Sequence, residues 1–272
     1  MINEKTQKRK PLILITNDDG VYSPGLCAAV EAVQDLGNLL IVAPISQQTS
    51  MGRSFPKSND VGIIEKVKIM VNGFEIEAYG VHGSPAQAVS HGVLELAYKK
   101  PDLCISGINY GENLGLSISC SGTVGAAYEA DSYNIPSIAV SKEVDLRIQH
   151  NSDYKEMDWE VSKKTLKDIA TEVLKNGFLD QVSILNINVP EGATVNTDIR
   201  ITKQARSNYS TFKKPEIRDY NMSYILKSQL DVDIDKIAKN SDVYAIYVDK
   251  VISITPLTWN LSVNTDWKYK NT

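Results

Sequence analysis

Two apolar runs separated by a helical pattern constrain the fold of this chain most strongly. The run at residues 12–16 is uninterrupted and rich in β-branched side chains, as is typical of a strand buried on both faces. From Pro24, apolar residues recur at helical spacing until Gly37, and a second apolar run follows at residues 39–43. A strand, a helix and a strand within about thirty residues predict a right-handed βαβ unit, and therefore a parallel sheet.

The same alternation continues along most of the chain. Residues 67–79 interrupt it, because two extended runs flank Asn72-Gly73, a strong signal for a β-hairpin. We therefore predict an α/β fold: a Rossmann-like, three-layer, doubly wound and mostly parallel sheet with a β-hairpin excursion. Helices are predicted from Pro85, at residues 123–133 and at residues 159–174, and strands at residues 103–106, 138–140 and 182–189.

Beyond Pro190 the pattern loosens. A polar stretch covers residues 204–220, and an apolar run covers residues 243–254, but neither continues the βαβ period. We expect a Rossmann-like catalytic domain at residues 11–203 and a C-terminal extension at residues 204–272. The extension is predicted to form a hairpin or an oligomerisation arm, with a strand near residues 243–254 that returns to the core.

Bulk properties exclude several classes of protein. A formal net charge of -4 and a pI near 5.5 do not supply the excess of positive charge that binds a long nucleic acid. The three cysteines are widely spaced and form no CxxC pair, so neither a disulfide framework nor a zinc knuckle is expected. The start of the chain has no apolar signal region, and no apolar run is long enough to span a bilayer. We expect a cytoplasmic protein that acts on small molecules.

In an open α/β sheet, ligands bind beyond the carboxyl ends of the strands, so the loops there matter most. The first predicted strand ends in Asn17-Asp18-Asp19-Gly20, the second is followed by residues 44–53, and the strand at residues 103–106 is followed by residues 107–111. Adjacent carboxylates at a strand end repel each other unless a cation lies between them. A cation held by Asp18, Asp19, a hydroxyl and the Asn109 amide has only oxygen ligands, which suits Mg²⁺ or Mn²⁺.

Two other interpretations of these loops stay open at this point. Asn, Asp and Gly are common in turns, so Asn17-Asp18-Asp19-Gly20 on its own equally indicates a simple turn. Ser121-Gly122-Thr123 precedes a predicted helix, where free N–H groups and the helix dipole attract phosphate. Ser121 or Thr123 could instead be an ordinary helix cap.

Several known phosphate and redox chemistries lack their signatures here. Residues 107–111 do not contain the Lys-Ser/Thr of a Walker loop, and no GxGxxG follows the first strand. Cys120 has no arginine six positions further on, as a cysteine-based phosphatase requires, so we interpret it as a packing residue. His82, His91 and His150 form no constellation, and structural or surface roles are expected for them.

Several ordered motifs resemble the SurE family, survival protein E, whose members are metal-dependent nucleoside monophosphate phosphatases. They are Thr16 to Gly20 with Ser23-Pro24-Gly25, Val42-Ala43-Pro44, Ser106 to Asn109 with Gly111, Asn113-Leu114-Gly115, and Ser121 to Val124. Weaker echoes occur at residues 185–188 and 253–257. The resemblance therefore extends over most of the chain.

The resemblance implies one divalent ion per subunit, Mg²⁺ or Mn²⁺, with Asp18, Asp19, Thr49 and Asn109 as ligands. The family usually has serine at the hydroxyl position, and Ser50 is the alternative to Thr49 here. Catalytic roles follow for Asp18, Asp19 and Asn109, and substrate phosphate contacts for Asn17, Asn113, Ser121, Gly122 and Thr123. A homodimer or homotetramer is implied, in which residues after about Gln204 exchange between subunits.

The chain also departs from the family pattern. Residues 116–120 lack the usual acidic and tyrosine residues, and Gly83-Ser84-Pro85-Ala86 replaces a usual Gly-Thr-Pro-x-Asp. We therefore predict the reaction, a 5′-nucleotidase activity with a possible 3′ activity, without predicting the preferred nucleotide. The competing hypotheses are a nucleoside hydrolase and a non-catalytic protein that binds a metal and a phosphorylated ligand.

Overall fold

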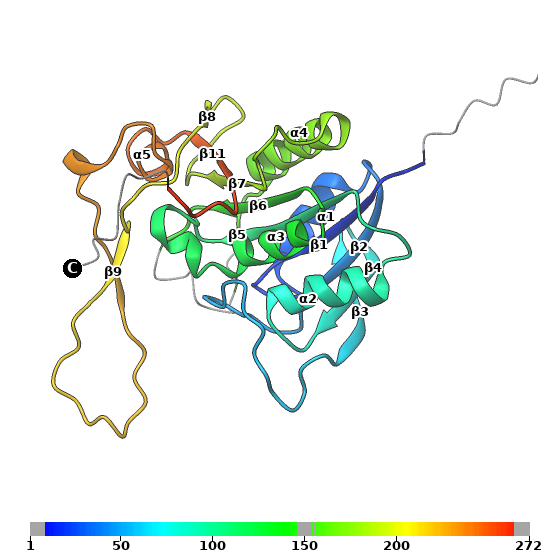
Figure 1. Ribbon diagram of the computed structural model, residues 1–272, viewed down its shortest axis with the longest axis horizontal. Coiled ribbons are helices and arrows are strands. Elements are labelled where there is room, and N and C mark those ends of the chain that lie inside the picture. The colour runs from blue at the N-terminus through cyan, green and yellow to red at the C-terminus, as the bar shows by residue number, and fades with distance from the viewer. Residues whose placement is uncertain (1–8, 146–153, 155, 264–272) are drawn as a thin grey trace, which may run out of the picture.

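The structure is a computed structural model that describes residues 9–145, 154 and 156–263. β1 (Leu12–Thr16) lies in the middle of the sheet, and all five of its side chains are buried. It pairs in parallel with β2 (Asn38–Pro44) on one side and β5 (Leu103–Tyr110) on the other. These three strands place the loops after residues 16, 44 and 110 at the same edge of the sheet (Figure 1).

Nine strands of the described residues form one sheet in the order β3-β4-β2-β1-β5-β6-β7-β11-β8. β4 (Phe74–Val81), β6 (Ser137–Lys142) and β7 (Ile184–Val189) run parallel to the central strands. β3 (Ile64–Val71) is antiparallel to β4, and the turn between them is Asn72-Gly73 with positive φ at both residues. The predicted mostly parallel α/β sheet and its hairpin are therefore confirmed.

Helices cover both faces of the sheet, and the side chains of β1 show how. Ile13 and Ile15 belong to a core cluster with α1 (Pro24–Val33) and α4 (Glu160–Asn176). Leu14 points to the other face and packs in a second cluster with α2 (Pro85–His91) and α3 (Gly122–Ser132). The alternation of side chains along one buried strand thus joins three layers.

One crossover of the sheet has an unusual hand. α3 joins β5 to β6 and α4 joins β6 to β7, so both connections move in the same direction across the sheet. Two connections of the same hand would place both helices on one face, yet α3 packs against α2 whereas α4 packs against α1. Because βαβ crossovers are right-handed in about 98% of cases, we assign the left-handed one to β6–α4–β7.

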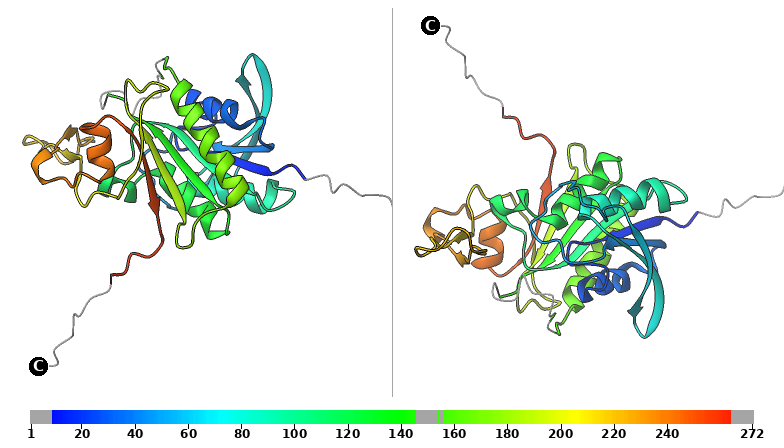
Figure 2. Two further views of the ribbon diagram at one scale, coloured as in Figure 1. Left: turned by 90° about the horizontal axis from the view of Figure 1, so that it is seen from above. Right: turned by 90° about the horizontal axis from the view of Figure 1, so that it is seen from below.

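The C-terminal part of the chain returns to the sheet. β11 (Ile252–Leu257) inserts between β7, to which it is antiparallel, and the short β8 (Ile199–Ile201). Before it, β9 (Ser210–Phe212) and β10 (Ser228–Leu230) form a two-stranded ribbon, and we call residues 204–231 the arm. The two further views place the arm at the opposite end of the molecule from the β3–β4 hairpin (Figure 2).

The strand predicted near residues 243–254 begins later than expected. Residues 242–247 form a helix, α5 (Asp242–Tyr247), and the strand starts only at Ile252. Ser241 explains the difference, because its hydroxyl accepts the N–H of Tyr244 and caps the helix. In the part of the chain that the structure describes, no helix combines the length and the apolar character of a membrane span.

Candidate functional site

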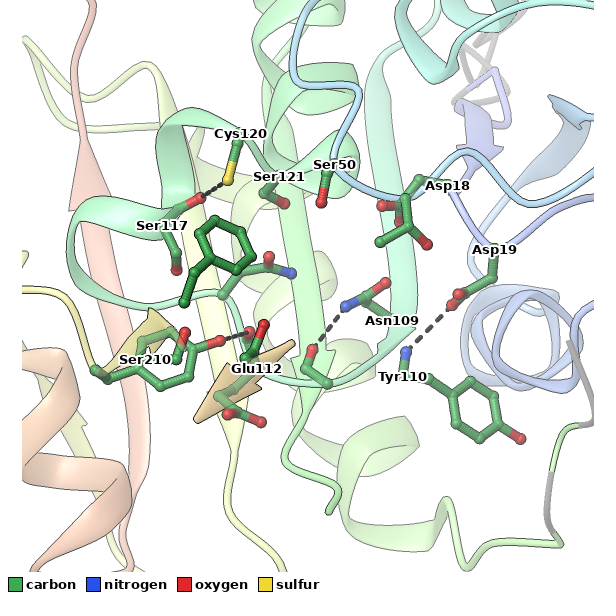
Figure 3. Close-up of a pocket in the computed structure, with 16 residues that line it drawn as sticks. Asp18, Asp19, Ser50, Asn109, Tyr110, Glu112, Ser117, Cys120, Ser121 and Ser210 are labelled. Carbon is green, nitrogen blue, oxygen red and sulfur yellow. Dashed lines mark hydrogen bonds between the residues drawn. The ribbon is translucent and has the colours of Figure 1, made fainter. Parts of the chain in front are cut away.

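A pocket opens at the carboxyl edge of the sheet, between the loops after β1, β2 and β5 and the arm (Figure 3). The structure brings most of the predicted site residues together here. Those that line the pocket are Asp18, Asp19, Thr49, Ser50, Asn109, Asn113 and Ser121. Asn17, in the loop after β1, and Gly122 and Thr123, in the first turn of α3, do not belong to its lining.

Asn17 gives the loop after β1 its shape. Its buried Oδ1 accepts the N–H of Gly20 at 3.1 Å, and its Nδ2 donates to Ser23 Oγ at 2.7 Å. Ser23 Oγ also accepts the N–H of Leu26 and caps α1. The amide that the sequence predicts as a phosphate ligand is therefore used within the loop.

Asp18 lies against the N-terminus of α3. Its Oδ1 accepts the Thr123 hydroxyl at 2.6 Å, and a Cβ added at Gly122 would come within 2.8 Å of its Oδ2. Burial raises the pKa of Asp18 to about 6, while hydrogen bonds from the hydroxyl and the backbone of Thr123 act to lower it. The helix terminus that the sequence predicts as a phosphate site therefore contacts the Asp18 carboxylate.

Asp19 is the more strongly perturbed carboxylate. Its Oδ2 accepts the N–H of Tyr110 at 3.1 Å, and its Oδ1 accepts Gln47 Nε2 at 3.3 Å. Burial, together with the charge of Asp18, raises the pKa of Asp19 to about 8. Within the described part of the chain neither carboxylate belongs to a salt bridge, so an external cation would relieve both.

β5 continues further than the sequence predicts, because residues 107–110 belong to the strand and not to a loop after it. Its pairing with β6 shifts register between Ser106 and Asn109. Gly107 allows this, since its φ is +134° and an added Cβ would lie 2.2 Å from the Val140 carbonyl oxygen. The shift places Asn109 on the pocket, where its Nδ2 donates to the Gly111 carbonyl at 2.6 Å. The Asn109 Oδ1 is left as a possible ligand for a cation.

The loop after β2 is fixed between Asp18 and α3. Gln48 N–H donates to the Asp18 carbonyl at 2.7 Å, and Gly52 N–H donates to the Cys120 carbonyl at 2.9 Å. Arg53 Nε pairs with the buried Glu129 of α3 at 2.7 Å. These contacts hold both Thr49 and Ser50 at the pocket, so either hydroxyl can serve as a ligand.

Asn113 is held by side chains of β7. Asn188 Oδ1 accepts the Asn113 N–H at 2.8 Å, and Asn186 Nδ2 donates to the Asn113 carbonyl at 2.8 Å. The Asn113 side chain donates to Ser141 Oγ at 2.9 Å. This explains the family echo at residues 185–188: its asparagines support the pocket loop from behind.

Several pocket residues escaped the sequence reasoning. The arm contributes Tyr209, Ser210, Phe212 and Ser228, and the loop after β5 contributes Glu112 and Ser117. The arm residues lie in short pieces without a hydrophobic period, so no sequence signal marked them. Cys120, interpreted from the sequence as a packing residue, directly follows the 3₁₀ turn at Gly115–Ser119 and is exposed on the pocket wall, so that interpretation is wrong.

The two described histidines, His82 and His91, do not line the pocket. His82 lies between Asp60 and Glu65, whose carboxylates raise its pKa, and His91 pairs with Glu95 at 2.5 Å. The predicted structural or surface role fits both. His150 lies outside the described residues.

The donor set decides which kind of metal the site could hold. No group of three or more His, Cys, Asp or Glu side chains that could hold a metal occurs in the described ranges. The predicted ligands that line the pocket instead offer the carboxylates of Asp18 and Asp19, the hydroxyls of Thr49 and Ser50 and the amide oxygen of Asn109, a set of hard donors that suits Mg²⁺ or Mn²⁺ better than zinc. Fold and site together define a doubly wound α/β protein with a mostly polar pocket, which contains two adjacent buried aspartates, at the carboxyl edge of its sheet.

Comparison with known proteins identifies the family. The family model described as "Survival protein SurE" matches residues 13–211. Proteins named 5′-nucleotidase SurE from Thermococcus gammatolerans and Methanocaldococcus jannaschii are 39% and 37% identical to this chain, covering 95% and 92% of it and 94% and 93% of themselves. The crystal structure of the SurE protein from Aquifex aeolicus superposes with a TM-score of 0.72 at 29% identity, over 93% of this chain and 95% of that one. The chain belongs to the SurE family.

Proposed function

We propose that this chain is a metal-dependent phosphomonoesterase that hydrolyses nucleoside 5′-monophosphates to nucleosides and phosphate. The observation that carries the proposal is the buried pair Asp18 and Asp19, which lines a pocket of hydroxyl and amide groups. The name 5′-nucleotidase SurE, borne by the relatives, supports the substrate class. Hydrolysis of nucleoside 3′-monophosphates belongs to the same proposal.

One divalent ion per subunit, Mg²⁺ or Mn²⁺, is proposed as the cofactor. Its ligands are Asp18, Asp19, Asn109 Oδ1 and the hydroxyl of Thr49, with Ser50 as the alternative. When bound, such an ion polarises a phosphoryl oxygen and lowers the pKa of a bound water. Thr123 and the N-terminus of α3 hold Asp18 in place, while Tyr110 N–H and Gln47 hold Asp19.

The phosphate is proposed to lie between Ser121 and Asn113. Both line the pocket, and Ser121 caps α3. The backbone N–H groups at the N-terminus of α3 and the helix dipole favour an anion there. We propose that Asn17, Gly122 and Thr123 act indirectly, by shaping the loop and positioning Asp18. Asp18 or Asp19 then accepts a hydrogen bond from the attacking water and orients it towards phosphorus.

The wider setting is proposed from the same features. The net charge of -4 favours small nucleotides over long nucleic acids. All three cysteines, which lie in described residues, are free, as suits a reducing cytoplasm. We propose a catalytic domain at residues 11–203 and an extension at residues 204–272 that holds a homodimer or homotetramer.

The experiment is a phosphate-release panel. Nucleoside 5′- and 3′-monophosphates, p-nitrophenyl phosphate and a short polyphosphate are assayed with Mg²⁺, with Mn²⁺ and after chelation. We expect phosphate release from the 5′-monophosphates only when a divalent ion is present. Activity that survives chelation contradicts the proposed cofactor, release of ribose favours a nucleoside hydrolase, and nucleotide binding without turnover favours a non-catalytic binder.

A further inference from the structure

The arm presents one aromatic ring to the pocket. Three of the described aromatic side chains line it, but Tyr110 and Tyr209 are only 5% exposed, whereas Phe212 is 66% exposed. Phe212 is therefore the lining aromatic ring whose face is open to a ligand. The pocket around it is otherwise polar, with hydroxyl, amide and carboxylate groups.

Strand register explains why Phe212 faces the pocket. Phe212 pairs with Ser228, and Ser210 pairs with Leu230. Residues directly opposite in an antiparallel pair, and residues two apart in one strand, share a face. Phe212, Ser210 and Ser228 are thus on one face of the ribbon, and all three line the pocket, whereas Thr211 and Gln229 are on the other face and do not.

The ribbon is fastened to the site, so the position of Phe212 is set by the fold. Tyr209 Oη donates to the Glu112 carbonyl at 3.0 Å, and Leu116 N–H donates to the Ser207 carbonyl at 3.2 Å. Both contacts join the arm to the loop that carries Asn113. In the close-up, Ser210 and Ser117 lie across the pocket from Asp18 and Asp19 (Figure 3).

The pocket is smaller than the clefts that usually bury a ligand of nucleotide size. It encloses about 160 Å³, below the roughly 300 Å³ of clefts that bury a drug-sized ligand. A phosphate held at the carboxylate end therefore leaves the base at the mouth, where the ring of Phe212 is exposed. We propose that Phe212 is the surface on which the nucleobase stacks, an inference that rests on the proposed nucleotidase function. Because every base has a π face, such a platform favours nucleotides over other monoesters and discriminates little between bases.

The test compares Phe212→Ala with wild type on AMP and on ribose 5-phosphate, which has the same phosphate and sugar but no base. Loss of base stacking predicts a rise of about 5- to 150-fold in KM for AMP, with kcat little changed. For ribose 5-phosphate we expect unchanged kcat and KM. Phe212→Trp should restore the KM for AMP, and Phe212→Leu, which is apolar but not aromatic, should not.

Phe74→Ala is the matched control, because Phe74 is also an exposed phenylalanine but lies on the β3–β4 hairpin. It should leave both substrates unaffected, and light scattering should give the same oligomeric state for every variant. An equal loss for both substrates, an unchanged KM for AMP, or full rescue by leucine overturns the proposal.

Failure of the proposed nucleotidase function can be distinguished from failure of the stacking proposal. If wild type releases phosphate from neither substrate, calorimetric dissociation constants of AMP and ribose 5-phosphate test the stacking directly. Weaker binding of AMP alone by Phe212→Ala supports the proposal, and any other pattern overturns it.

Discussion

Asp19 is proposed to bind the metal ion, but its burial beside Asp18 lowers the stability of the metal-free fold. Its buried carboxylate lies beside a second carboxylate, and its pKa is raised to about 8. We expect Asp19→Asn to abolish phosphatase activity and, in metal-free buffer, to raise Tm by about 2–4 °C or more, the shift that roughly 1 kcal/mol produces in a chain of this size. The asparagine keeps an acceptor for Tyr110 N–H, and Gln47 can reverse its amide to accept the new NH₂. A phosphate-release assay measures the activity, and thermal unfolding followed by circular dichroism measures the Tm.

The pH dependence of this difference has a definite sign. A carboxyl whose pKa is higher in the folded state binds more protons there, so folding stability falls as pH rises from the unfolded pKa near 4 towards the folded value. The Tm advantage of Asp19→Asn should be fully developed above about pH 8 and disappear near pH 4. Added Mg²⁺ or Mn²⁺ should raise the Tm of wild type but not of the variant. A variant that is less stable than wild type at pH 8 without metal would contradict this account.

At the level of single residues, strand ends were predictable and side-chain partners were not. Asp18, Asp19, Asn109 and Ser121 could be selected because apolar runs show where parallel strands end. The sequence does not show that Thr123 would bond to Asp18, since that contact joins residues 105 positions apart. Phe212 carried no signal at all, because an isolated aromatic residue in a polar stretch has no period.

At the level of elements, Asp242 of α5 connects this helix to the arm and to Gly115, in the segment that follows Asn113. Its Oδ2 accepts Gly115 N–H at 2.9 Å, and its Oδ1 accepts Ala205 N–H at 2.9 Å. A buried donor without a partner costs about 1–3 kcal/mol, so Asp242→Ala should lower the free energy of unfolding by roughly 2 kcal/mol or more. Urea denaturation measures this loss. Asp249→Ala is the control, since its pair with Arg200 is partly exposed and should contribute less than about 1 kcal/mol. Equal losses in the two variants would show that Asp242 does not fasten the arm.

Elements with a clear period were the ones that could be predicted. The strands and helices up to residue 189 follow the expected order, within a few residues at their ends. α5 was missed because an apolar run of that length fits a strand or a buried helix equally well, and only the capping by Ser241 decides between them. The extension of β5 through residue 110 depends on the register shift against β6, which a single strand does not reveal.

At the scale of the whole molecule, we predict that the tip of the arm holds the oligomer together. Ile217, Tyr220, Met222 and Ile225 are largely exposed there, more apolar surface than a short loop needs. Lys213 N–H bonds to the Lys227 carbonyl, so residues 214–226 can be replaced by an Asn-Gly turn that closes the ribbon and keeps Phe212. We expect this variant to keep its Tm within about 2 °C and to be a monomer by light scattering. A variant that keeps the size of wild type would show that the tip does not hold the oligomer.

The strand order also has a consequence for the birth of the chain on the ribosome. β1 pairs with β2, which follows it closely, but its other neighbour is β5, whose first residue is Leu103. While the intervening residues are being synthesised, one edge of the apolar segment Leu12–Thr16 stays unpaired and able to accept a foreign strand. We therefore expect nascent chains stalled before residue 103 to need a chaperone, and chains stalled far enough beyond residue 142 for β5 and β6 to have left the ribosome to need it far less.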